Sequence, residues 1–517
     1  MPRSRELAIA VVTTLALAGG ACRKDPSTTT TTPTDEFGEA GAGYVAQCSG
    51  WFPDWISANP PGPEVASFQL AQGYFLGIPE FETVDGEVQV VKWNPPAPAT
   101  TVASAPWLAH DFHVPAQRLP YLQALLDYVM LGMPEADFVA QANTKRRWYH
   151  VPMMTTSPTS RREPYRGTTK ERPLNASAHS WIAAGNQLDS FAIGYYNALG
   201  SYTLGQVFNN PDPQLSDPSK ARFIDGTLVF KLIFAEYTPA KIVAAQDPLV
   251  GSPEWQVQDV EAPAAPLKSV RLLQLDIAVR DPRATETGWV FATYVFDKSK
   301  AAEPVAWRRL TPVGLQWGND PDVTGPGVGT LDQSWANTAA LPALFQNKLG
   351  RDGRLNGPVD NPASSCLSCH STAQLRTGAA PVSAFRGVRL VPAGACTNAQ
   401  DMTWFRNLSG STPFGTMTSN GTGCTLEAAQ PATPPLHALD YSLQLADGLE
   451  SSLFYQNPNP CEATAMAMRA AQKAPAKSAG PMDQRMMRTV AERPGRVKLS
   501  KESAKQLLRQ DDTLHRR

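Results

Sequence analysis

Five consecutive residues, Cys366-Leu367-Ser368-Cys369-His370, constrain this chain more than any other stretch. They form C-x-x-C-H, the pattern at which haem c is attached covalently. Two thiols add across the two vinyl groups of the porphyrin, and the two-residue gap places both sulfurs along one haem edge. The histidine that follows directs its imidazole at the iron as proximal ligand. Since the chain has only 7 Cys and 7 His in 517 residues, chance produces this pattern in roughly one such chain in a thousand.

Zinc binding and thiol redox chemistry are the alternatives for the same five residues. A closed zinc site needs four ligands, usually with a second Cys or His pair at short spacing, and no such pair lies nearby in the sequence. A thioredoxin-like C-x-x-C pair needs no histidine after it. We therefore expect one haem c, provided that the chain is exported.

The N-terminus carries the features of an export signal. Arg3 and Arg5 form a positive region, and Leu7–Ala18 is apolar apart from two threonines. This stretch is shorter than the ~20 residues of a membrane span, which indicates a signal peptide. Cys22 follows a run of small residues and resembles the lipidated cysteine of a bacterial lipoprotein, although Gly19 stands where Leu is usual. Secretion without a lipid is the alternative.

We expect the chain to lie outside the cytoplasm, in the periplasm or at the outer membrane or cell surface. The membrane would be reached only through a lipid on Cys22, because no later segment has ~18 uninterrupted apolar residues. The net charge of −1 gives no case for a nucleic-acid partner.

Four further cysteines suggest two disulfides in an oxidising compartment. We favour Cys396–Cys424, which closes a loop near the haem, and Cys48–Cys461, which ties together the two ends of the folded part. Three connectivities are possible, and buried free thiols are the alternative.

The length predicts about three domains, and the fold class that we expect is α+β. Hydrophobic spacing predicts helices over Leu119–Met133 and Trp181–Leu199. Alternating or β-branched runs predict strands over 88–93, Thr227–Tyr237, Val270–Val279, Trp289–Phe296 and Val313–Trp317. These strands would form an antiparallel sheet with helices on one side.

The expected boundaries follow from these patterns. They are a signal peptide over 1–21, a flexible tether over 22–43, an α+β domain of unknown role over 44–330, a mostly helical haem domain over 331–461 and a basic disordered tail over 462–517. From Ala463 the tail has thirteen Lys or Arg against five acidic residues.

The region 331–461 resembles the class I c-type cytochromes. Ser364 or Ser365 is a candidate cap for a helix that contains the motif, and apolar residues between Leu439 and Leu453 trace a closing helix. Only Cys366, Cys369 and His370 match a defined motif of that family. The resemblance implies covalent haem, His370 on the iron and transfer of single electrons to a redox partner protein of unknown identity.

The second axial ligand of such a haem is commonly Met or His. We favour Met402, because Trp404 and Phe405 beside it are suited to wall a haem face. Met417 and His437 are the alternatives, and an open or water-bound position or a ligand from the N-terminal domain remains.

We favour electron transfer over catalysis for this chain. One alternative is a haem enzyme with an open distal site, similar to a peroxidase, and another is a haem-based sensor or binding lipoprotein. The single copy of the motif excludes a multi-haem wire and a di-haem peroxidase.

Three smaller groups of residues complete the candidates. Arg351 and Arg354 precede the motif and are suited to pair with haem propionates. Asp276, Arg280 and Asp281 lie at the end of a predicted strand, where we expect an ion pair. His110 and His113 have a spacing that can hold a metal on a helix, and surface or satisfied histidines are the simpler expectation.

Overall fold

The computed structural model describes residues 68, 78–84, 87–94, 105–152, 154, 162–208, 216–262, 265–376, 390–392, 397–417, 426–427, 436–453 and 498–499. The predictions for the signal peptide, the tether, Cys22, the two disulfides and almost all of the basic tail lie outside the described residues. Among the helices of the described part, none is long and apolar enough to cross a membrane.

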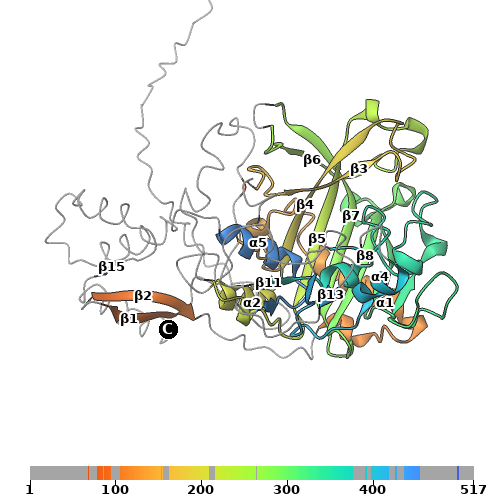
Figure 1. Cartoon of the computed structure of the whole chain (residues 1–517). Helices are drawn as coiled ribbons and strands as arrows, with labels where there is room; N and C mark the ends of the chain where they lie inside the picture. The colour runs from red at the N-terminus through yellow and green to blue at the C-terminus, as the bar shows by residue number, and fades with distance from the viewer. Residues whose placement is uncertain are drawn as a thin grey trace, which may run out of the picture. The chain divides into compact units, whose positions relative to one another are not determined.

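One antiparallel sheet of eight strands forms the centre of the described chain (Figure 1). Seven strands follow the order β10-β9-β8-β7-β5-β4-β3, and β6 pairs with β7 beyond this path. Their bounds are β3 Thr169–Asn175, β4 Gln187–Tyr196, β5 Leu228–Glu236, β6 Glu254–Val257, β7 Lys268–Arg280, β8 Trp289–Phe296, β9 Leu310–Gln316 and β10 Ser334–Ala336. The predicted antiparallel sheet is confirmed.

Short strands outside this sheet form three small pairings. They are β1 Ile78–Val84, β2 Glu87–Asn94 and β15 Lys498–Leu499 in one sheet, β11 Gln374–Arg376 with β14 Leu436–Ala438, and β12 Thr416–Met417 with β13 Leu426–Glu427. The predicted strand over 88–93 is β2.

The helix predicted over Trp181–Leu199 is wrong, because most of that stretch is strand β4. Phe191 and Tyr195 lie four residues apart, which matches one turn of a helix but equally two full repeats of a strand. Both side chains point into the same apolar cluster of the sheet. The helix α2, Ala198–Val207, begins only after Asn197, whose side chain accepts a hydrogen bond from the amide of Gly200.

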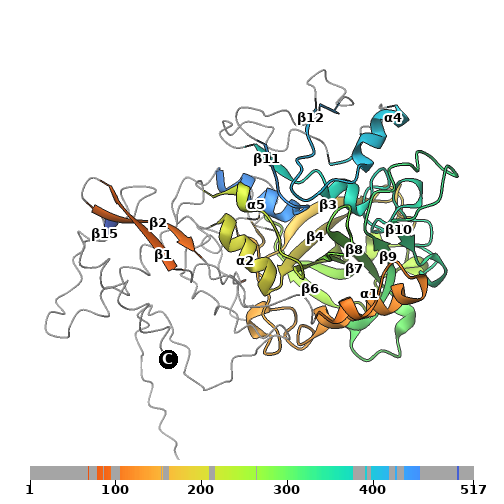
Figure 2. The same cartoon turned by 90° about the horizontal axis from the view of Figure 1, so that it is seen from below.

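Helices cover both faces of the sheet, so the prediction of helices on one side is wrong. The helix α1, Arg118–Met130, packs with its buried leucines against Phe230, Leu275 and Ile277 on one face. The helix α5, Leu443–Leu453, packs on the other face with Phe291. Figure 2 shows α1 and α5 on opposite sides of the strands.

The face beneath α5 carries two apolar clusters with polar residues between them. One cluster includes Tyr196, Phe291, Leu367, Leu375, Leu439 and Leu445, and the other includes Leu188, Ile233, Leu273, Val295, Leu341 and Leu355. One row of paired residues crosses five strands between them: Gly194, Lys231, Asp276, Thr293 and Gly314. Two ionisable side chains, Lys231 and Asp276, at the centre of a covered sheet are unusual, and each needs polar or charged partners.

The residues after the eighth strand pack directly on this face. Their α-helices in the described part are short: α3 Cys366–His370, α4 Asn398–Asp401 and α5. The described chain thus combines a large sheet with few helices, which is an α+β or mostly β fold. The helical cytochrome-like unit predicted over 331–461 is not shown.

Candidate functional site

The motif residues form the one-turn helix α3, which begins at a complete capping box. Ser365 accepts a hydrogen bond from the amide of Ser368 at 3.1 Å, and the Ser368 hydroxyl accepts one from the amide of Ser365 at 2.8 Å. The predicted cap is therefore Ser365. Gln316 at the end of β9 joins the same turn, since it donates to the Ser365 hydroxyl at 3.1 Å and accepts from the amide of Leu367 at 3.0 Å. These bonds fix α3 on the sheet.

His370 is held in one orientation by the residues around it. Its Nδ1 lies 2.8 Å from the carbonyl oxygen of Tyr441. A carbonyl only accepts, so Nδ1 carries the proton and Nε2 carries the lone pair in the neutral ring. The ring of Phe291 lies 4.7 Å from the imidazole, centroid to centroid. Metal-ligating histidines are commonly oriented by this kind of bond from the other ring nitrogen.

Cys366 lies where the two apolar clusters of the sheet face meet. Its Sγ is 3.9 Å from the Thr293 hydroxyl and 4.0 Å from Oδ1 of Asn356. Burial, together with the charges of Asp276 and Asp360, raises the pKa of the Cys366 thiol well above its usual value. A thiol of this kind is a poor nucleophile at neutral pH, which disfavours the thioredoxin-like alternative.

Asp276 and Asp360 form a carboxyl pair beside this cysteine. The Nε2 of Gln274 donates to both oxygens of Asp276, at 3.0 and 2.9 Å, and to Oδ2 of Asp360 at 3.1 Å. Thr293 donates to Oδ1 of Asp276 at 2.8 Å. The amide of Gly357 donates to Asp360 at 3.0 Å, and a side chain at this glycine would collide with Gln274. The backbone is thus shaped around the pair.

The electrostatics of the pair favour one retained proton. Burial, and then the charge of Asp360, raise the pKa of Asp276 to about 7. Burial also raises the pKa of Asp360. Two carboxyls this close cannot both ionise without a cost, so the pair holds a proton into the neutral range.

An ion pair lies next to the carboxyl pair on the same sheet face. Nζ of Lys231 is 3.0 Å from Glu171, and their side chains are 30% and 33% exposed. Although burial opposes it, the charges of Glu171, Asp360 and Asp276 raise the pKa of Lys231. Asp276, Asp360 and Cys366 also keep partial exposure, so solvent reaches this part of the central sheet.

The ion pair predicted for Asp276 is wrong. Arg280 instead contacts Asp225 and Asp440, at 3.4 and 3.0 Å, and Asp281 pairs with Arg283 at 2.7 Å. Asp276 lies at the middle of β7 rather than at its end, which removes it from those arginines.

The interpretation of Arg354 as a propionate partner is wrong. This side chain is fully buried, and its guanidinium donates to the carbonyl oxygens of Asn319, Asp320 and Val323 at 2.7 to 2.8 Å. Arg351 is paired with Asp401. Both cations hold loops in place.

The three candidate distal ligands lie on different elements. Met402 begins the 3-10 helix η14, Met402–Phe405, which contacts α3, and it packs against Trp404 and Phe405. His437 lies on β14, opposite Leu375 of β11, and β11 is the strand that follows α3. Met417 lies on β12. The choice among them stays a prediction.

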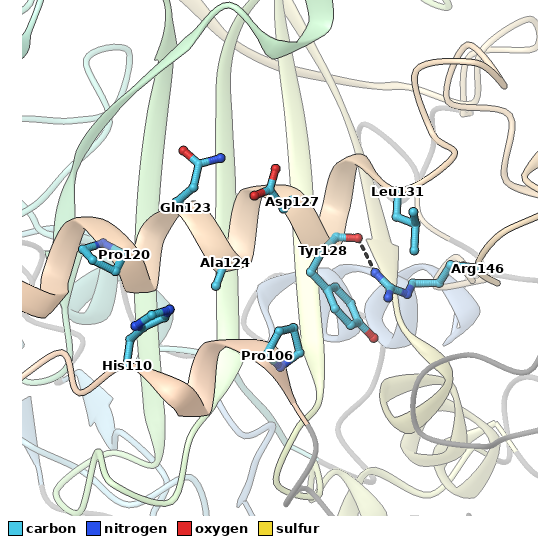
Figure 3. Close-up of a pocket in the computed structure, with 9 residues that line it drawn as sticks. All are labelled: Pro106, His110, Pro120, Gln123, Ala124, Asp127, Tyr128, Leu131 and Arg146. Atoms are coloured by element: carbon cyan, nitrogen blue, oxygen red, sulfur yellow. Dashed lines mark hydrogen bonds between the residues drawn. The ribbon is translucent and has the colours of Figure 1, made fainter.

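A pocket of about 520 Å³ runs along α1, on the helix that covers the opposite sheet face (Figure 3). It is lined by Pro106, His110, Pro120, Gln123, Ala124, Asp127, Tyr128, Leu131 and Arg146. None of the C-x-x-C-H residues lines this pocket. His113, the second histidine of the predicted spacing, contacts Asp111 at 3.0 Å, and no group of three or more potential metal ligands occurs in the described part of the chain.

Comparisons with known proteins give no relative. No protein-family model matches the chain, and neither a curated protein nor a solved structure is similar to it. The functional argument therefore depends on the site geometry.

Sequence reasoning missed the carboxyl pair and Lys231. A signal was present in β5 and β7, where Lys231 interrupts the apolar run Leu228–Ala235 and Asp276 interrupts the apolar run Leu275–Val279. Asp360 carried no such signal, because it lies in a loop.

Proposed function

We propose that this chain is an exported c-type cytochrome with one haem, which transfers single electrons to and from a partner protein. The observation that carries the proposal is the orientation of His370. His370 lies on the same short helix as Cys366 and Cys369, and its Nδ1 donates a hydrogen bond to the Tyr441 carbonyl. The residues present therefore fit the group that the motif implies.

Each residue has a separate role in this proposal. Cys366 and Cys369 hold haem c through thioether bonds, and His370 supplies Nε2 as proximal ligand. Phe291 and Tyr441, both 5% exposed, limit the movement of the imidazole. The bound haem supplies one-electron redox chemistry. The sheet supplies a fixed support through Gln316, which reduces reorganisation around the site.

Met402 is the distal ligand in this proposal, with Met417 and His437 as alternatives. A thioether ligand needs a dry environment, and Trp404 and Phe405 beside Met402 are fully buried. A lipid on Cys22 would hold the protein at the membrane, where its redox partner is reached.

A haem enzyme with an open distal position is the second candidate. The proton held by Asp276 and Asp360 favours it, because reduction of a peroxide consumes protons and needs a nearby acid. The ligation state of the iron separates the two candidates.

The test is expression of the full chain in a host that matures c-type haem. Haem should remain attached after denaturation and extraction, and Cys366→Ser with Cys369→Ser should abolish this attachment. Cys396→Ser with Cys424→Ser is the matched control, since it also removes two cysteines and should keep haem. Haem that survives extraction without Cys366 and Cys369 would refute the assignment.

The ferric absorption spectrum of the same protein decides the ligation. Low-spin haem with the long-wavelength charge-transfer band of Met–His ligation supports the electron carrier. A high-spin ferric spectrum supports the enzyme.

A further inference from the structure

We propose that Asp276 and Asp360 are the proton acceptor of the redox site, so that each electron taken up is accompanied by a proton bound to this pair. The inference rests on the proposed function, since it needs haem at Cys366. It adds a role for residues outside the C-x-x-C-H motif.

The position of the pair carries the first step. Oδ1 of Asp276 lies 2.8 Å from the Thr293 hydroxyl, and that hydroxyl lies 3.9 Å from Sγ of Cys366. One side chain thus separates the carboxyl from the sulfur that anchors the haem. A change of charge at the haem acts on this carboxyl through protein rather than through bulk water. Electrostatic interactions are stronger through protein because its dielectric constant is lower.

The hydrogen bonds within the pair carry the second step. One amide group, that of Gln274, serves both carboxyls, and it is fully buried. With both carboxyls ionised, two negative charges converge on this single neutral group. A proton on either carboxyl relieves the repulsion, so the pair has two states that differ by one proton.

The charges around the pair leave it as the group that titrates. The charged and titratable groups that act on it are Lys231 from β5, Arg172 from β3 and Cys366 from α3. Glu171 from β3 pairs with Lys231, and Cys369 interacts with Cys366. Lys231 pairs with Glu171 and lowers the pKa of both carboxyls, but burial outweighs this effect. Both thiols become uncharged thioethers once haem is attached. Arg172 also donates to the Val359 carbonyl at 2.8 Å.

Protons from solvent can reach the pair. Asp276 and Asp360 are both partly exposed, as is the neighbouring Lys231–Glu171 ion pair. The step is balanced: one electron enters the haem, one proton leaves solvent, and one carboxylate becomes a carboxylic acid. Oxidation returns both.

The direction of the coupling follows from charge. Reduction removes one positive charge from the haem, which raises the proton affinity of nearby carboxylates. The midpoint potential of the haem should therefore fall as pH rises through the range in which the pair loses its proton. An increase in proton affinity of about tenfold corresponds to a fall of about 59 mV for one electron.

The experiment is a spectroelectrochemical titration of the full-length haem protein between about pH 5 and about pH 9. The wild type should show the fall, and Asp276→Asn and Asp360→Asn should each remove most of it. Asp127→Asn is the matched control. Asp127 is a carboxylate on the opposite sheet face, 55% exposed and paired with Arg308, and its loss should leave the pH dependence unchanged.

A second measurement does not depend on the variants. Redox-difference infrared spectra of the wild type near neutral pH should show the carbonyl stretch of a carboxylic acid gained on reduction and shifted in deuterium oxide. A potential independent of pH, without this band, overturns the inference but leaves the proposed function standing. The same holds for a fall that Asp276→Asn and Asp360→Asn both retain. A protein without covalent haem overturns both.

Discussion

Replacement of Asp276 by Asn should make the protein more stable at alkaline pH, with little change under acidic conditions. The pKa of Asp276 rises from 3.8 to about 7 in the folded protein. Because the folded pKa of this acid is raised, its stability contribution is fully present below about pH 4 and is lost as pH rises to about 7. At 1.36 kcal/mol for each pKa unit, the loss reaches about 4 kcal/mol, and partial exposure of the side chain reduces it to about 2–4 kcal/mol.

Asparagine keeps the shape of the side chain and cannot ionise. Its amide can donate to Asp360, so the interaction that repels in the wild type becomes attractive. The difference in unfolding free energy between Asp276→Asn and wild type should therefore grow in favour of the variant by about 2–4 kcal/mol between about pH 4 and about pH 8. Carboxylates outside the Asp276–Asp360 pair titrate equally in both proteins and cancel in this difference.

The assay is urea unfolding of both haem-loaded proteins, followed by circular dichroism across that pH range. Asp127→Asn serves as control, because Asp127 forms an exposed ion pair with Arg308. Its loss should change stability by less than about 1 kcal/mol at every pH. A difference between Asp276→Asn and wild type that does not vary with pH would contradict the reasoning, since it would mean that Asp276 ionises as an ordinary surface carboxylate does.

Three further outcomes are expected. Gln316→Ala should cost about 2–4 kcal/mol in urea unfolding, because it removes both bonds to the first turn of α3 from a fully buried position; the exposed Gln346→Ala should cost less than about 0.5 kcal/mol. Met402→Ala should convert low-spin ferric haem to high-spin and remove the Met–His charge-transfer band, and an unchanged spectrum would move the assignment to Met417 or His437. Cys22→Ser should release the protein from membranes into the soluble periplasmic fraction, as measured by fractionation and lipid labelling; unchanged membrane association would refute the lipid anchor.

Much of the sheet could be predicted from the sequence, because its signals are local. Alternation in β5 and the aromatic, β-branched run of β8 located those strands to within a residue or two. The cap at Ser365 is likewise a local pattern. The strand β4 was missed because a spacing of four residues fits a helix and a strand alike. The prediction placed all helices on one face of the sheet because the sequence does not show which face each helix covers. Only tertiary packing decides this.

The candidate site divides in the same way. C-x-x-C-H is contiguous, so its residues could be named without a structure. The carboxyl pair joins a strand to a loop, and Gln274 and Asp360 are 86 positions apart. No local spacing encodes such a meeting. The identity of the distal ligand could not be predicted from local spacing either, since it depends on how segments outside the motif fold back towards His370.

The packing of the motif region on the sheet limits how the chain can be divided. Leu367, Leu375 and Leu439 share one apolar cluster with Tyr196 and Phe291 of the sheet, and Leu355 shares the other with Ile233. The core beneath the motif is thus shared with strands β4, β5 and β8, which come earlier in the chain. A fragment limited to 331–461 lacks that part of the core. Recombination that moves the C-x-x-C-H motif without β4, β5 and β8 is therefore expected to leave both fragments with an incomplete core.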